Sequence, residues 1–204
     1  MNQTFREKEE KLETLVGLER VDALNTLSSS LVYSEPGKAE IYAQEALSLA
    51  HQFDYSIGSA VSCHNLGSYY YLKGDYDQAE TYAYKALQGF EENAFQTGMY
   101  DIYTLIGTIC MSRGKLQKAM KYYLKALAIS EVSKDKRKIT IAYENIGTIH
   151  NRQKHYAKEL ESRVKALKIF REVGDREGEA TCCQNIGKSL LMLRRPERAL
   201  KHYQ

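Results

Sequence analysis

The sequence predicts an all-α fold of stacked helical hairpins. A glycine recurs every 40 residues, at Gly67, Gly107, Gly147 and Gly187, inside segments that otherwise have helical composition. The apolar residues between these glycines follow a helical spacing, and only two prolines interrupt the chain of 204 residues. Because glycine inside a helix costs about 1 kcal/mol relative to alanine, its return at a fixed interval indicates a structural repeat.

Other small residues recur at the same interval. Alanine stands nineteen residues after the first three glycines, at Ala86, Ala126 and Ala166, and a leucine follows each. Twelve residues after the four glycines come Ala79, Ala119, Glu159 and Ala199. Small residues at matching positions of paired helices let their backbones approach closely, and this packing offsets the lost helix propensity. The alternative is that each glycine forms a kink or hinge.

Each period divides into two helices of about 17 residues, joined by short polar turns such as LKGDY at 72–76. We expect Gly74 and Gly114 to take the left-handed conformation that commonly ends a helix. We expect Asp75 to cap the helix that follows it and Pro196 to lie in the first turn of another helix. Every period is therefore predicted to be one helical hairpin.

We expect a lead-in helix over residues 1–17, followed by an array of about five repeats over residues 18–204. The expected repeats are 18–54, 55–94, 95–134, 135–174 and 175–204. The last repeat is truncated, because its second helix begins near Pro196 and the chain ends at Gln204. Since terminal repeats normally carry a polar cap, the sequence indicates a fragment of a longer protein. The uncovered apolar face of this last repeat predicts self-association as a homodimer.

The composition is that of a foldable cytoplasmic protein. Hydrophobic residues make up 43% of the chain and charged residues 27%, which excludes a disordered segment. No apolar run approaches the roughly 18 residues that a membrane span needs. The N-terminal sequence MNQTFREKEEKLETL is charged and lacks the apolar centre of a secretory signal. We therefore expect a cytoplasmic location and no membrane association.

The sequence contains no recognisable catalytic motif. It lacks the GxxxxGK[ST] loop that holds phosphates, the GxSxG turn of hydrolases and the HExxH pair of zinc enzymes. The four cysteines, Cys63, Cys110, Cys182 and Cys183, form no CxxC pair and are expected to serve as small buried residues. We therefore expect no enzyme activity, no metal and no cofactor in this chain.

The pattern resembles the tetratricopeptide repeat (TPR). The family's small residue, the aromatic residue three positions on and two alanines correspond to Gly67, Tyr70, Ala79 and Ala86 in the second repeat. The corresponding residues are Gly107, Cys110, Ala119 and Ala126 in the third repeat, and Gly147, His150, Glu159 and Ala166 in the fourth. The resemblance covers about residues 20–204. It implies a right-handed superhelix, an α-solenoid, whose first helices line a concave groove that binds a protein or peptide.

The sequence also departs from the family pattern. The period exceeds the usual ~34 residues, so either the helices or their connections are extended. Glu159 replaces an alanine, which predicts a looser contact there, and Leu27 takes the glycine position in the first repeat. The extended type is similar to Pins-like scaffolds. It is also similar to the N-terminal regions of bacterial signalling proteins that precede a histidine kinase, adenylate cyclase or diguanylate cyclase.

This similarity implies the regulatory or sensor module of a signal-transduction protein whose output domain lies beyond the chain. The alternatives are a free-standing adaptor and an oligomerisation module. The lysines with which chaperone-tail-binding members of the family hold a terminal carboxylate are missing, so we do not expect that partner.

Asparagine recurs two positions before the glycine phase, at Asn25, Asn65, Asn145 and Asn185. An asparagine amide offers both a donor and an acceptor, and could hold the backbone of an extended peptide, a role that the TPR resemblance also supports. The alternative is a structural hydrogen bond between neighbouring hairpins. The other predicted groove residues are His64, Ser68, Tyr71, Thr104, Thr108, Glu144, Thr148, Gln184 and Lys188.

Charge is distributed unevenly along the chain. Residues 1–100 carry 7 Lys and Arg against 15 Asp and Glu, whereas residues 101–204 carry 22 against 11. The basic half could steer an acidic partner. The cluster KDKRK at 134–138 raises nucleic-acid binding as a competing function. We favour a solvated charged face for this cluster.

Overall fold

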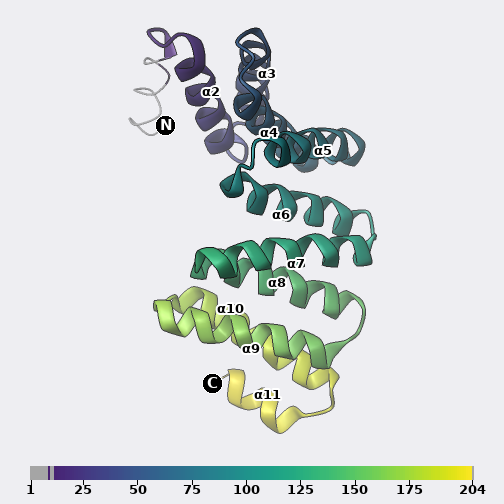
Figure 1. Cartoon of the computed structure of the whole chain (residues 1–204). Helices are drawn as coiled ribbons and strands as arrows, with labels where there is room; N and C mark the ends of the chain where they lie inside the picture. Colours follow the sequence, from purple (N-terminus) through teal and green to yellow (C-terminus); the bar gives the residue numbers. More distant parts are fainter. Residues whose placement is uncertain (1–8, 10–11, 204) are drawn as a thin grey trace. The chain divides into compact units, whose positions relative to one another are not determined.

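The computed structural model describes residues 9 and 12–203, and their regular secondary structure is entirely α-helical. The helices are α2 (Gly17–Leu31), α3 (Pro36–Gln52), α4 (Ser56–Lys73), α5 (Tyr76–Glu92), α6 (Gln96–Ser112), α7 (Leu116–Ser133), α8 (Lys136–Arg152), α9 (Tyr156–Val173), α10 (Arg176–Met192) and α11 (Pro196–Tyr203) (Figure 1). The predicted all-α fold is thus confirmed. The lead-in helix predicted over residues 1–17 falls largely outside the described residues. None of the helices in the described part of the chain is long and apolar enough to cross a membrane.

The turns between helices repeat every 20 residues, which is half of the sequence period. In the described residues, a residue with positive φ follows each helix from α3 to α10, at Asp54, Gly74, Ala94, Gly114, Lys134, Lys154, Gly174 and Arg194. The next residue donates its N–H to the carbonyl oxygen five positions earlier, as Asp75 does to Tyr70 at 3.0 Å. This hydrogen bond is the Schellman arrangement that ends many helices. The left-handed conformation predicted for Gly74 and Gly114 is confirmed.

Three turns end with an aspartate that caps the next helix. The carboxylates of Asp75, Asp135 and Asp175 each accept a hydrogen bond of 2.9–3.1 Å from the backbone N–H three residues on. Pro196 begins α11, as predicted. Because α3 to α10 contain 17 or 18 residues each, the extra length of the repeat lies in its helices rather than in its connections.

The chain divides into two compact units, Met1–Ile109 and Cys110–Gln204, and the division falls inside α6. In the first unit α2 packs with α3, α3 with α4 and α4 with α5, and α2 also contacts α4. In the second unit α7, α8, α9, α10 and α11 pack in succession. Within each unit, the short turns make successive helices antiparallel neighbours (Figure 1).

Alanines on the second helix of each hairpin form the small-residue side of the core. The buried alanines include Ala39, Ala43 and Ala46 on α3, Ala79, Ala83 and Ala86 on α5, Ala119 and Ala126 on α7, and Ala166 on α9. The apolar residues that precede the repeat glycines are buried as well: Leu66, Ile106, Ile146 and Ile186. Large side chains of the first helices therefore pack over small residues of the second helices, as the sequence period predicts.

Gly67 is a point of close contact between helices. A Cβ atom at this residue would lie 3.2 Å from Leu105 Cδ2, 3.4 Å from the backbone nitrogen of Ala83 and 3.5 Å from the carbonyl oxygen of Ala79. The last two atoms belong to the backbone of α5, and α4 continues beyond Gly67 to Lys73. The geometry at this glycine therefore supports close packing rather than a helix break.

The cysteines behave as small core residues. Cys63, Cys110 and Cys182 are buried with free thiols, whereas Cys183 is half-buried. Burial raises the pKa of the Cys63 and Cys182 thiols to about 11, so both are protonated at neutral pH. The predicted packing role is thus confirmed for the three buried cysteines.

Candidate functional site

The predicted groove residues lie on the first helices of the hairpins. In the first unit, the half-buried residues are His64, Ser68 and Tyr71 on α4 and Thr104 and Thr108 on α6. In the second unit, Glu144, Asn145 and Thr148 on α8 and Asn185 on α10 are half-buried, and Gln184 and Lys188 on α10 are exposed. Residues four apart share one helix face, so each of these helices presents polar side chains one turn apart. Their contact with a ligand stays a prediction.

Asn25 and Asn65 connect neighbouring hairpins inside the first unit. Each is only 4% exposed. Asn65 Nδ2 donates to the backbone oxygen of Asn25 at 2.9 Å, and Asn25 Nδ2 donates to the backbone oxygen of Gly58 at 3.1 Å. Asn25 Oδ1 accepts a hydrogen bond of 2.9 Å from Ser62 Oγ. This network joins α2 to α4, so the geometry favours the structural alternative for these two asparagines.

Replacing Asn65 with alanine is expected to lower the free energy of unfolding by about 1–3 kcal/mol, because it leaves buried acceptors on Asn25 with fewer donors. Urea unfolding followed by circular dichroism measures the change. Ser68→Ala, a half-buried position on the same helix, is the control and should shift stability by less than about 0.5 kcal/mol. Equal stabilities of Asn65→Ala and the wild type would contradict a structural role.

His64 faces an acidic side chain from the next first helix. Burial lowers its pKa below the usual 6.5, whereas the charge of Asp101 on α6 and a hydrogen bond with the Asn65 side chain act in the opposite direction. The imidazole is therefore neutral at pH 7. A neutral imidazole has one N–H donor and one acceptor nitrogen, which suits hydrogen bonding to a peptide backbone.

Replacing Asp101 with asparagine is expected to lower the pKa of His64 further, because the charge that stabilises the imidazolium is removed. An NMR titration of the His64 ring measures this. The pKa of His64 is lower in the folded state than in the unfolded state, so the unfolded state binds more protons at pH values between the two pKa values. The free energy of unfolding of the wild type therefore falls as the pH drops below about 6.5. A rise in the pKa of His64 in Asp101→Asn would refute the charge interaction between the two residues.

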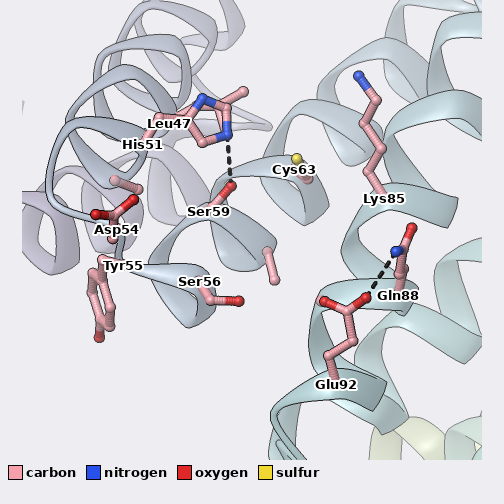
Figure 2. Close-up of a pocket in the computed structure, with 13 residues that line it drawn as sticks. Leu47, His51, Asp54, Tyr55, Ser56, Ser59, Cys63, Lys85, Gln88 and Glu92 are labelled. Carbon is pink, nitrogen blue, oxygen red and sulfur yellow. Dashed lines mark hydrogen bonds between the residues drawn. The ribbon is translucent and has the colours of Figure 1, made fainter.

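A cleft in the first unit, lined by both polar and apolar residues, was not predicted from the sequence. It has a volume of about 500 Å³ and lies between α3, the start of α4 and α5 (Figure 2). His51 Nε2 and Ser59 Oγ are 3.1 Å apart on one side, and Gln88 Nε2 donates to Glu92 Oε1 at 2.8 Å on the other. Lys85 also lines the cleft. Because cationic and anionic side chains are mixed and no motif joins them, the cleft favours no ligand charge.

The fourth repeat carries a buried ion pair in place of two small residues. Glu159 and Arg163 take the positions that Ala79 and Ala83 hold in the second repeat. They are 2% and 8% exposed, and Arg163 Nε lies 3.7 Å from Glu159 Oε1. Glu159 Oε2 also accepts a hydrogen bond of 2.8 Å from Asn151 Nδ2. The looser contact predicted at Glu159 is therefore replaced by a polar cluster.

Gly147 makes room for this arginine. A Cβ atom at Gly147 would lie 3.4 Å from Arg163 Nε and 3.6 Å from Ser162 Cβ, so its nearest neighbours are side-chain atoms. The Arg163 guanidinium extends to Thr148, whose Oγ1 lies 3.5 Å from Nη2. Glycines at the same phase thus serve two purposes: Gly67 allows two backbones to approach, and Gly147 leaves space for a long side chain.

The recurring antiparallel hairpins define an all-α helical-repeat protein of the α-solenoid class. Two family models, both described as tetratricopeptide repeat, match residues 59–92 and 100–132. These two matches identify tetratricopeptide repeats within residues 59–132 of this chain. No curated protein matches the sequence.

Solved structures share the fold at low sequence identity. BtubC (BKLC) from P. vanneervenii is 18% identical with a TM-score of 0.78, over 90% of this chain and 76% of that one. A STAND protein with a tetratricopeptide repeat sensor from Pyrococcus horikoshii is 18% identical with a TM-score of 0.80, over 95% and 31%. A Rap protein complexed with competence and sporulation factor is 16% identical with a TM-score of 0.76, over 98% and 66%.

Proposed function

We propose that this chain binds an extended segment of a protein or peptide along the predicted groove residues of its first helices. The observation that carries this proposal is a polar pair at one phase of four successive first helices. The pairs are His64 and Ser68, Thr104 and Thr108, Glu144 and Thr148, and Gln184 and Lys188. Six of these eight side chains are half-buried, which suits hydrogen bonding to a ligand that covers them.

The similar structures support the same function. The Rap protein that shares the fold forms a complex with competence and sporulation factor, and the STAND protein uses its tetratricopeptide repeats as a sensor. This chain spans about a third of the STAND protein. We therefore propose that the chain is a regulatory or sensor module of a cytoplasmic bacterial signalling protein, with the free-standing adaptor as the alternative.

Selection from a random peptide display library tests the binding function. Enriched peptides are labelled, and their affinities are measured by fluorescence anisotropy. Ser68→Trp places a bulky ring among the predicted groove residues and should weaken binding about tenfold or more, since it excludes the ligand from contacts worth at least about 1.4 kcal/mol. Gln78→Trp, exposed on the second helix α5, is the control and should bind as the wild type does.

The outcomes separate the alternatives. Absence of enriched peptides, or equal binding by both tryptophan variants, would end the proposal. Sedimentation that shows a dimer at all concentrations would favour the oligomerisation module. Binding of a labelled oligonucleotide that weakens steeply with salt would favour nucleic acid. That last function has less support, because Lys136 of the basic cluster is already paired with Glu172 at 3.1 Å.

A further inference from the structure

The guanidinium of Arg163 has more donors than the surrounding protein uses. Its side chain is 9% exposed. Nε is buried and has no hydrogen-bond acceptor among the described residues, since Glu159 Oε1 at 3.7 Å forms an ion pair beyond hydrogen-bond length. In the described part of the chain, Nη2 donates to Thr148 Oγ1 alone, at 3.5 Å. An arginine offers five N–H donors, four of them on the two Nη atoms. Because Nε is closed to solvent, the Nη donors are the ones that can meet a further acceptor.

The arginine also lies at an unusual place in the repeat. The residues at the same phase of the earlier second helices are Ala43, Ala83 and Tyr123, and all three are buried in the core. Arg163 instead passes Gly147 and brings its guanidinium to Thr148 on the first helix α8. A charged group from a second helix is thereby delivered to the predicted groove residues of the fourth repeat.

We propose that the Arg163 guanidinium binds a carboxylate of an acidic partner segment and so makes the fourth repeat selective for Asp or Glu, whereas the Thr148 hydroxyl, which already donates to the Glu144 backbone oxygen at 2.9 Å, holds the guanidinium in place. This inference rests on the proposed peptide-binding function. A guanidinium forms short, charge-assisted hydrogen bonds with a carboxylate. The second unit carries 22 Lys and Arg against 10 Asp and Glu, a net charge of +12, which attracts an acidic segment before contact is made.

Glu144 is the charge that opposes this ligand. It lies one turn before Thr148 on α8 and is half-buried. Burial raises the pKa of its carboxyl, whereas the charge of Arg163 lowers that pKa, so the two groups are close enough to interact. A basic partner would pair with Glu144 and an acidic partner with Arg163. Substitution of Glu144 therefore has opposite effects on the two kinds of ligand.

Two labelled probes test the proposal by fluorescence anisotropy: a peptide of alternating Glu and Ala, and one of alternating Lys and Ala. The double variant Glu159→Ala/Arg163→Ala restores the residues of the second repeat and leaves the net charge unchanged. The control Glu161→Ala/Lys165→Ala removes an exposed pair of opposite charges from the same helix. Thermal unfolding by circular dichroism verifies that both double variants are folded.

The wild type is expected to bind the Glu–Ala peptide more tightly than the Lys–Ala peptide. Glu159→Ala/Arg163→Ala should weaken Glu–Ala binding by about tenfold, as expected for loss of one charge-assisted contact. The control should stay within about twofold of the wild type. Glu144→Gln should bind the Glu–Ala peptide more tightly, because it removes the opposing charge.

Unchanged Glu–Ala binding in Glu159→Ala/Arg163→Ala would overturn the proposal, and so would weaker binding in Glu144→Gln or preferred binding of the Lys–Ala peptide. These outcomes are distinct from failure of the proposed function. If library-selected peptides are lost in Ser68→Trp but bind the double variant normally, the groove function stands and the carboxylate site falls. If Ser68→Trp has no effect on any peptide, both fall.

Discussion

Replacing Arg163 with alanine is expected to lower the free energy of unfolding by about 3–5 kcal/mol, because it leaves a buried carboxylate without its counter-charge. Glu159 is 2% exposed, and its partner in the ion pair is the Arg163 Nε atom at 3.7 Å. The hydrogen bond from Asn151 Nδ2 remains but carries no charge. Urea unfolding at neutral pH, followed by circular dichroism, measures the loss.

The double variant Glu159→Ala/Arg163→Ala is expected to recover most of this stability. It reproduces the residues Ala79 and Ala83 of the second repeat, and replacement of a buried ion pair by apolar residues is often neutral or stabilising. Stability of the double variant as low as that of Arg163→Ala would mean that the arginine supports the hairpin through its packing and not through its charge. The exposed pair Glu161→Ala/Lys165→Ala serves as control, with a change below about 1 kcal/mol.

The fold could be predicted because the same pattern of small and apolar residues recurs in successive repeats. Gly67 on α4 packs against Ala79 on α5, and the return of both residue types after 40 residues makes the pattern visible. The half-period of 20 in the turns was not visible. The glycine at residue 74 predicts a left-handed conformation, but Lys134 adopts the same conformation although its residue type does not predict it.

The candidate site could be predicted less completely. Helical periodicity assigns Asn25 and Asn65 to a face, but the faces that meet the next hairpin and the ligand adjoin one another on the helix. The burial of both asparagines and the hydrogen bond between them favour the face that meets the next hairpin. Both observations depend on the packing of α2 against α4. The sequence assigns His64 to a first helix, yet its charge interaction with Asp101 depends on the position of α6.

Arg163 was missed because second helices were interpreted as core. The signal in the sequence was a charged residue at the phase where Ala43 and Ala83 stand, accompanied four residues earlier by Glu159. Two charged residues that replace two alanines at i and i+4 predict a buried pair, since neither could be placed in the core alone. The cleft beside Lys85 carries no comparable signal, because its residues come from three helices.

Replacing Gly67 with leucine is expected to lower the free energy of unfolding by about 1–3 kcal/mol through overpacking. The backbone atoms of Ala79 and Ala83 stand 3.4–3.5 Å from the position of a Cβ, and they cannot move without displacing α5. Leucine has a better helix propensity than glycine by nearly 1 kcal/mol, so the measured loss is net of that gain. Urea unfolding again provides the measurement, and an unchanged stability would argue against close packing at this residue.

The same substitution at Gly147 distinguishes the two purposes of the glycine. Its neighbours are the side chains of Arg163 and Ser162, and Arg163 can be removed. Gly147→Leu should destabilise the wild type by about 1–3 kcal/mol but should have little effect in the Glu159→Ala/Arg163→Ala background, where leucine fills the space that the arginine leaves. Gly67→Leu should be equally harmful in both backgrounds, since its backbone neighbours belong to α5, the second helix of its own hairpin, and are unchanged in the Glu159→Ala/Arg163→Ala background. If that background relieved neither substitution, backbone approach would be the common reason for both glycines, and Gly147 would have no special relation to Arg163.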